Sequence, residues 1–494
     1  MDKRLSVIKA DSLLAGVTQK SETARITKTP KADTGRWAAS LPVSLVPVSV
    51  GLMVLVLAFG LPAPASAQNH APKLDFIRDA EIEHIIQGYA RPIFKAAEIN
   101  PDSVEIMLVK DESINAFVAG GQNLFIHTGL LMECENPEQL VGVIAHESGH
   151  IAGGHLFRGR DAMENASAEA MVAMVLGIGA AVLSGQGAAA GAIGMGGSDV
   201  AMRGYLSFSR SQEATADQAG LSFLDHAHLS AQGYYDFLKK LSGQELLPSS
   251  RQVSYTRTHP LTSERIDAVA EHLQHSAWKN AHLPASDTEL FARLKAKLMG
   301  FMRPGVALRR YSADNPSIAA RYARAIAYYQ QGDIRTALPL IDALIAQEPR
   351  NPFFYELKGQ VLMENQRLAE SLPPYRKSVE LEPQSGLLRA SLAQALIEIN
   401  TPAYTDEALK HLEFATRQEH DAPMLWRLVA TAWGRKNNDG MVAYALAEEA
   451  LARGDRAAAR FHSTHAEKLL PRGSPGWLRA QDIHAVADDR RGDR

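Results

Sequence analysis

The sequence is poor in cysteine, in net charge and in long apolar runs. Among its 494 residues Cys134 is the single cysteine, so the chain can close no intramolecular disulfide and build no cysteine-based zinc site. The formal net charge of -3 gives no sign of a nucleic-acid surface. The strongest apolar run, Val48 to Leu61, has about 14 residues, whereas a membrane-spanning helix needs about 20. What remains is an ordinary globular composition, sufficient for two or three domains.

The N-terminus carries the features of an export signal. Basic residues outnumber acidic ones by eight to four over residues 1–36, and the apolar run Val48 to Leu61 has the length of a signal-peptide core. Small residues then supply a cleavage site at Ala65-Ser66-Ala67. We therefore expect residues 1–67 to be a signal peptide and the mature protein to start near Gln68 in the periplasm. The alternative is an uncleaved inner-membrane anchor.

A His-Glu-x-x-His motif follows a helix start. Asn136 and Pro137 are residues preferred at the N-cap and at the first helical position, so the segment after them is predicted to be helical. On a helix, His146 and His150 project from one face and can reach a single ion. Neutral imidazoles suit Zn²⁺, and Glu147 would act as general base on the water that the ion activates. The alternative is a buried histidine pair satisfied by carbonyls.

The sequence leaves the third ligand open between two candidates, since a catalytic zinc ion needs three protein ligands and a free position. His155 lies nine residues after His146, one short of the spacing of a metzincin-type third histidine, and Gly153-Gly154 makes a continuous helix there doubtful. Glu213 is the better candidate because it belongs to a second predicted helix. Asp217 would share its face and could hydrogen-bond either a ligand histidine or the reaction intermediate.

Residues 68–300 are predicted to form an α+β domain, mostly helical with a small antiparallel sheet. Apolar spacing indicates one long helix from Lys73 to Lys95, whereas 104–109 and 116–131 read as strands, the latter as a hairpin around Gly120-Gly121. An edge strand of this sheet could hold an extended substrate by β-addition. A purely scaffolding hairpin is an equal alternative.

The segment from 170 to 198 contains no charged residue. It could be an element that contacts a membrane peripherally or a lid. We favour two small-residue helices or a mobile loop over the cleft, because the apolar part is too short to span a bilayer.

Residues 305–485 are predicted to form an all-α array of tetratricopeptide repeats, followed by a disordered tail at 486–494. Pro349 and Pro383 are separated by 34 residues, the period of that repeat, with Gly359 and Tyr375 at repeat positions between them. Such arrays bind proteins.

Several motifs together resemble the Ste24-like zinc metallopeptidases. The resemblance rests on the His146 motif and on Ser209-Arg210-x-x-Glu213-x-x-Ala216-Asp217-x-x-Gly220, with Asn115-Ala116-Phe117 before them and Thr258-His259-Pro260 and Arg265-Ile266 after them. Together with the export signal and the repeats, the pattern is similar to the periplasmic β-barrel assembly-enhancing protease group.

The resemblance implies a zincin-like fold, with Glu213 as the third zinc ligand and Asp217 as a catalytic carboxylate. It also implies that His259 lies near the metal, where it could donate to the oxyanion or occupy the open metal position and keep the enzyme latent; loop structure at Pro260 is the alternative. The implied activity is that of an exported zinc endopeptidase acting on unfolded, misfolded or stalled outer-membrane proteins, with the outer-membrane β-barrel assembly machinery as a partner. The alternatives are a chaperone or scaffold with a latent peptidase, and an inner-membrane-anchored quality-control protease.

Overall fold

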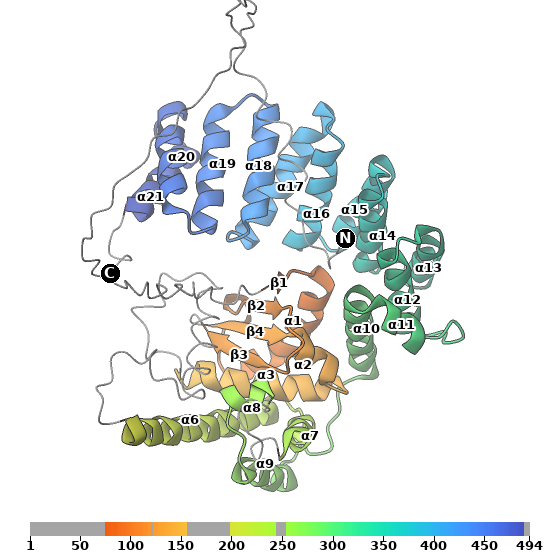
Figure 1. Cartoon of the computed structure of the whole chain (residues 1–494), viewed down its shortest axis with the longest axis vertical. Helices are drawn as coiled ribbons and strands as arrows, with labels where there is room; N and C mark the ends of the chain where they lie inside the picture. Colours follow the sequence, from red (N-terminus) through yellow and green to blue (C-terminus); the bar gives the residue numbers. More distant parts are fainter. Residues whose placement is uncertain (1–74, 120–121, 156–197, 244–252, 489–494) are drawn as a thin grey trace, which may run out of the picture. The chain divides into compact units, whose positions relative to one another are not determined.

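The computed structural model describes residues 75–119, 122–155, 198–243 and 253–488 (Figure 1). The expected signal peptide, nearly all of the uncharged segment and most of the C-terminal tail lie outside these residues.

A four-stranded sheet forms the β part of the first half. Its strands lie in the order β1 (Phe76–Ile77), β2 (Ile106–Val109), β4 (Asn123–His127) and β3 (Ala116–Ala119). The β3–β4 hairpin is antiparallel, as predicted, but the expectation of an antiparallel sheet is wrong for one pair, because β2 and β4 run parallel. After β2 the chain leaves a space one strand wide and forms β3 on its far side. β4 then folds back into this space and pairs with both β2 and β3. β3 is therefore an edge strand.

Two predicted boundaries differ from the structure. The helix expected from Lys73 begins only with α1 (Ala80–Ala96), because the Asp79 carboxylate caps it by accepting hydrogen bonds from the Glu81 and Ile82 N–H groups. Phe76 and Ile77 pair with β2 instead. The second strand of the hairpin ends at His127, and α2 (Thr128–Glu133) follows because the Thr128 hydroxyl and the Gly129 N–H bond to the Asp111 carbonyl.

The His-Glu-x-x-His segment is helical, as predicted. Asn136 accepts from the Gln139 N–H and caps α3 (Pro137–Ala152), which packs against β3 and against α6 (Ser198–His226) and α7 (Gln232–Leu241) (Figure 1). The backbones of α3 and α6 nearly touch: a Cβ on Gly149 would lie 2.4 Å from the Ala216 carbonyl oxygen. This close crossing brings the carboxylates of α6 to the imidazoles of α3.

The remaining helices continue the chain into the repeats. They are α8 (Ser254–Thr258), α9 (Ser263–His275), α10 (Ala285–Met302), α11 (Pro304–Arg310), α12 (Ile318–Gln330), α13 (Ile334–Gln347), α14 (Pro352–Glu364), α15 (Leu368–Leu381), α16 (Gly386–Glu398), α17 (Thr405–Gln418), α18 (Pro423–Arg435), α19 (Asp439–Ala452), α20 (Arg456–Leu469) and α21 (Pro475–Asp488), with short 3₁₀ turns at Pro101–Ser103 and Pro402–Tyr404.

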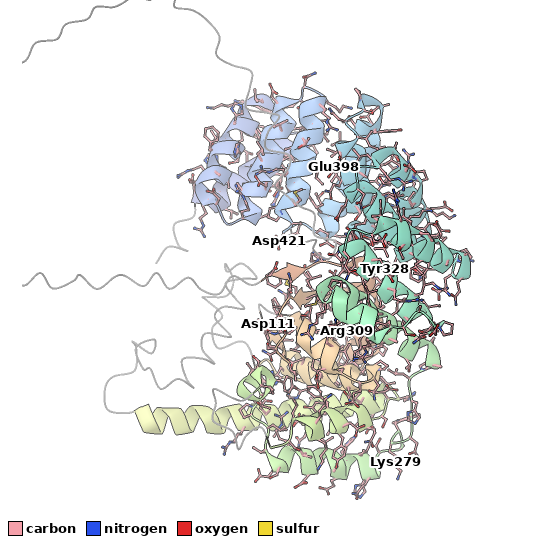
Figure 2. The ribbon with its side chains drawn as sticks, turned by 45° about the vertical axis from the view of Figure 1, so that its right-hand side comes forward. Asp111, Lys279, Arg309, Tyr328, Glu398 and Asp421 are labelled. Carbon is pink, nitrogen blue, oxygen red and sulfur yellow. The ribbon has the colours of Figure 1, made fainter. Side chains whose placement is uncertain are left out.

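The predicted repeat pattern is confirmed as an array of paired helices. A Cβ on Gly359 of α14 would lie 2.7 Å from the Tyr375 ring of α15, so these two repeat positions pack directly on each other. Arg309 and Tyr328 mark the adjoining helices α11 and α12 at the start of the array (Figure 2). Among the described residues, none of the helices combines the length and apolar character needed to cross a bilayer.

A buried ionic cluster ties the first repeat helix to the peptidase half. The Lys297 ammonium on α10 lies 2.8 Å from the Asp79 carboxylate and 3.2 Å from that of Glu81. The Tyr322 hydroxyl of α12 donates to Glu81 at 2.6 Å. One hydrophobic core runs from Ile77 to Val361 around this cluster, so the first repeats and the sheet domain share their packing.

Candidate metal centre

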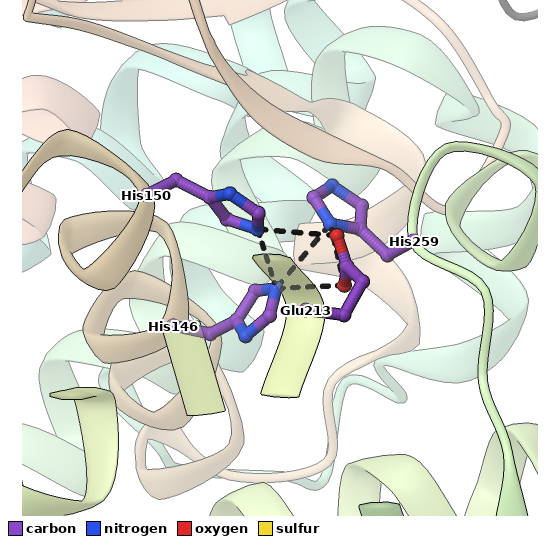
Figure 3. Close-up of side chains that lie close together, drawn as sticks. All are labelled: His146, His150, Glu213 and His259. Atoms are coloured by element: carbon purple, nitrogen blue, oxygen red, sulfur yellow. Dashed lines mark hydrogen bonds and ion pairs between the residues drawn. The ribbon is translucent and has the colours of Figure 1, made fainter. Parts of the chain in front are cut away.

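Four potential metal ligands from three elements converge at one buried point. His146 and His150 come from α3, Glu213 from α6 and His259 from the loop after α8 (Figure 3). Each is less than 9% exposed, and one ligand atom from each lies within 4.8 Å of all the others. The structure thus places together every ligand candidate except His155.

The distances from His146 Nε2 to the other three residues fit tetrahedral coordination of one ion. His146 Nε2 lies 3.1 Å from His150 Nε2 and 3.3 Å from both His259 Nδ1 and Glu213 Oε2. Glu213 Oε1 is 3.3 Å from His150 Nε2. Four ligands about 2.0–2.1 Å from a tetrahedral zinc ion lie about 3.3 Å from one another. The donor set of imidazoles and one carboxylate is also the kind that zinc prefers.

Asp217 does not belong to the ligand cluster but contacts His146 on the ring nitrogen opposite the one that faces the other ligands. Its Oδ1 is 2.8 Å from His146 Nδ1, so the Nδ1–H donates to it and the Nε2 lone pair points into the site. The Tyr234 hydroxyl donates to the same oxygen at 2.7 Å. Of the two contacts that the sequence left open for Asp217, this geometry favours the bond to a ligand histidine.

Arg265 joins the two carboxylates of α6. Its Nε lies 2.6 Å from Asp217 Oδ2 and its Nη1 lies 2.9 Å from Glu213 Oε2. The sequence motif contained Arg265, but nothing in its spacing gave it a role. One feature of the sequence could have drawn attention to Arg265. It lies in the first turn of α9, where the helix dipole disfavours a positive charge.

The neighbours of these groups determine their protonation. Burial alone would raise the pKa of Asp217, but Arg265 holds it well below its usual range. Burial opposes protonation of His146, yet its hydrogen bonds to the Asp217 and Glu213 carboxylates raise its pKa to about 9. Burial lowers the pKa of His150 to about 4. In the absence of a metal, therefore, His146 is a charged imidazolium at neutral pH, whereas His150 is a neutral imidazole with a proton on one ring nitrogen.

Glu147 has a buried carboxylate beside the cluster. Neither of its oxygens has a hydrogen-bond partner within the part of the chain that the structure describes, and Oε1 lies 3.4 Å from His259 Nε2. Burial raises its pKa. A carboxylate with a raised pKa is suited to take up a proton and release it again.

Comparison with known proteins identifies this half of the chain. Residues 77–273 match the profile of peptidase family M48, and residues 322–386 match a tetratricopeptide repeat. The chain carries a family M48 peptidase domain. The resemblance inferred from its motifs, and its assignment to the metalloendopeptidases, are thereby confirmed.

The chain is similar to several proteins, two of them over about two thirds of its length or more. The chain is 27% identical over 371 residues to the β-barrel assembly-enhancing protease of Escherichia coli (strain K12), covering 73% of this chain and 74% of that protein. It is 27% identical to the Yersinia pestis protein of the same name, covering 66% of each. The mitochondrial metalloendopeptidase OMA1 of Schizosaccharomyces pombe is 26% identical over 172 residues, which are 34% of this chain and 46% of that one.

His259 connects the M48 ligand cluster to the edge strand. Its Nε2 lies 3.2 Å from the Ala116 carbonyl of β3, while its Nδ1 faces His146 and Glu213. The Tyr255 ring stacks on the imidazole, with centroids 4.7 Å apart and planes 25° apart. The His259 loop is therefore held over the metal site from two sides.

His155 lies next to the M48 cluster without joining it. Its Nδ1 is 3.0 Å from His150 Nδ1, the ring nitrogen that points away from the other ligands. Glu213, which lies on α6 more than 60 residues further along the chain, belongs to the cluster of potential ligands, and His155 does not.

Proposed function

We propose that this chain is an exported, zinc-dependent endopeptidase that hydrolyses misfolded or stalled proteins of the bacterial envelope, including outer-membrane proteins. The observation that most strongly supports this function is the buried set of His146, His150 and Glu213. Their spacings suit one zinc ion, and the Glu147 carboxylate lies beside them. The names of the relatives support the substrate class.

This geometry supports a role for each residue of the site. His146, His150 and Glu213 would hold the zinc ion, which would supply Lewis acidity to polarise the scissile carbonyl and to lower the pKa of a water to about 7. Glu147 takes the proton of the attacking water and passes it to the leaving amine. Asp217 and Arg265 keep His146 and Glu213 in place.

The substrate is proposed to add to β3. Asn115 and His127 form a hydrogen-bonded pair, so by the alternation of an antiparallel ladder the main-chain groups of Ala116 and Val118 point away from β4. The bond from His259 to the Ala116 carbonyl shows that this side accepts donors. An extended peptide there would lie beside the metal site.

A second candidate is a chaperone or scaffold whose peptidase is latent. It is favoured by the position of His259, whose Nδ1 lies 3.3 Å from both His146 Nε2 and Glu213 Oε2 and could serve as a fourth ligand, where a catalytic zinc site leaves a position for water. In this version His259 must leave before cleavage begins. If a Glu147→Gln variant retained the full cellular function, the scaffold version would be preferred over the protease.

The experiment uses cells that express an assembly-defective outer-membrane protein. Wild type is expected to lower the level of the stalled protein, and Glu147→Gln is expected to leave it unchanged. N-terminal sequencing of the mature protein tests export in the same cells: a start near Gln68 is expected, and a retained N-terminus would favour the inner-membrane anchor. Equal clearance by both variants would refute the proteolytic role.

A further inference from the structure

The C-terminus of α3 folds back on one of its own metal-facing histidines. The His155 N–H bonds to the His150 carbonyl at 3.2 Å and the Gly154 N–H bonds to the Ile151 carbonyl at 3.1 Å. Gly154 has φ +61°. These are the two bonds and the left-handed residue of a Schellman motif, in which the residue after the glycine packs on the residue five positions earlier. Here that contact is a hydrogen bond between two imidazoles.

The direction of this hydrogen bond follows from the chemistry of His150. When Nε2 of a neutral imidazole binds a metal, Nδ1 carries the proton and must donate. His150 Nε2 faces Glu213 and His146, and its Nδ1 lies 3.0 Å from His155 Nδ1. His155 must therefore be neutral, with its own proton on Nε2 and the lone pair of Nδ1 accepting.

From this geometry we propose that His155 is a positioning residue for the metal, which orients His150 and fixes its tautomer. The inference rests on the proposed zinc site and adds a residue to it. His146 has a carboxylate, Asp217, in the equivalent position at 2.8 Å. The two histidines of the motif are thus oriented by different acceptors, one anionic and one neutral.

Gly153 makes room for this arrangement. A Cβ at Gly153 would lie 2.5 Å from His155 Nε2, so any larger residue must push the ring away. Its own backbone has φ -73° and would accept alanine without strain. Gly153→Ala is therefore a way to move His155 without removing it.

The test measures how the purified mature protein, loaded with zinc, releases the metal to a chelator. His155→Phe keeps a ring but removes the acceptor, and it is expected to weaken zinc binding about 10- to 100-fold, as losses of such partners do. Gly153→Ala should show the same direction of effect. His155→Asn places an amide oxygen near the position of Nδ1 and should restore slow release. His275→Phe, at an exposed histidine on α9, is the matched control and should release zinc like wild type.

Two further readouts separate positioning from folding. The visible spectrum of the Co²⁺-substituted protein should change in His155→Phe and return in His155→Asn, and the loss in casein cleavage should fall on kcat more than on KM. Wild-type zinc release in both His155→Phe and Gly153→Ala would overturn the proposal. If His155→Phe does not fold, Gly153→Ala decides alone. A wild type that binds no zinc would instead overturn the proposed function.

Discussion

Arg265 is the residue whose loss should affect the site most. It is 6% exposed, and its guanidinium touches the carboxylates of Asp217 and Glu213, which are 4% and 3% exposed. Arg265→Met removes the charge and keeps most of the side-chain volume. Two buried carboxylates would then share one metal-free pocket with no guanidinium beside them.

The expected cost is large because these groups cannot be solvated. Removing one partner of a buried ion pair costs about 3–5 kcal/mol of unfolding free energy. Arg303 provides a matched control, since its bridge to Glu112 joins side chains that are 48% and 67% exposed. Arg303→Met should cost about 0–1 kcal/mol.

Urea unfolding followed by circular dichroism in EDTA measures both variants. The loss in Arg265→Met should shrink when zinc is present, because the ion is a second cation beside Glu213. Adding Asp217→Asn to Arg265→Met should recover part of the stability, since one uncompensated charge disappears. If the loss of unfolding free energy in Arg265→Met were no larger than that in Arg303→Met, or if zinc left it unchanged, the buried carboxylates would not depend on Arg265.

Three further predictions concern the inhibitory role of His259, the titration of the site and the junction with the repeats. His259→Ala should cleave casein faster than wild type if His259 occupies the position of water; equal or slower cleavage counts against this inhibitory role. In EDTA, the melting temperature should fall as pH rises from about 6.5 to 9, because His146, with its pKa raised to about 9, gives up the proton that stabilises the folded form; a flat profile would contradict this. Lys297→Met should cost about 3–5 kcal/mol in the same urea assay, because it leaves Asp79 and Glu81 buried without their ammonium partner; a cost below about 1 kcal/mol would show that the junction does not depend on it.

Local patterns predicted much of the fold. The cap at Asn136, the helix after it and the one-face spacing of His146 and His150 depend on neighbours within a few residues, and the structure has the helix as expected. The repeat period could likewise be read from the sequence, because it depends on contacts within each helix pair. The parallel pairing of β2 with β4 could not be read in this way, because it depends on which strand the hairpin places outermost.

Only the residues of the site that belong to a recognisable motif could be assigned a role from the sequence. The helix pattern around Glu213 and Asp217 favoured Glu213 before any resemblance was considered, whereas the resemblance alone pointed to His259. The structure brings both residues to α3, Glu213 on α6 and His259 in the α8–α9 loop. Arg265 belonged to the motif without a role, since its partners lie 48 and 52 positions earlier in the sequence. His155 was a weak ligand candidate because it lies nine residues after His146 and follows Gly153-Gly154. The sequence did not show that these glycines turn the chain back so that His155 meets His150.

The most direct test of the central claim pairs metal content with proteolysis. Purified mature wild type and Glu147→Gln are compared for bound zinc and for cleavage of casein. We expect about one zinc ion per chain in both proteins, cleavage by wild type, and loss of cleavage in Glu147→Gln, because only the proton acceptor has been removed. Absence of zinc and of cleavage in wild type, or equal cleavage by the two proteins, would contradict the central claim.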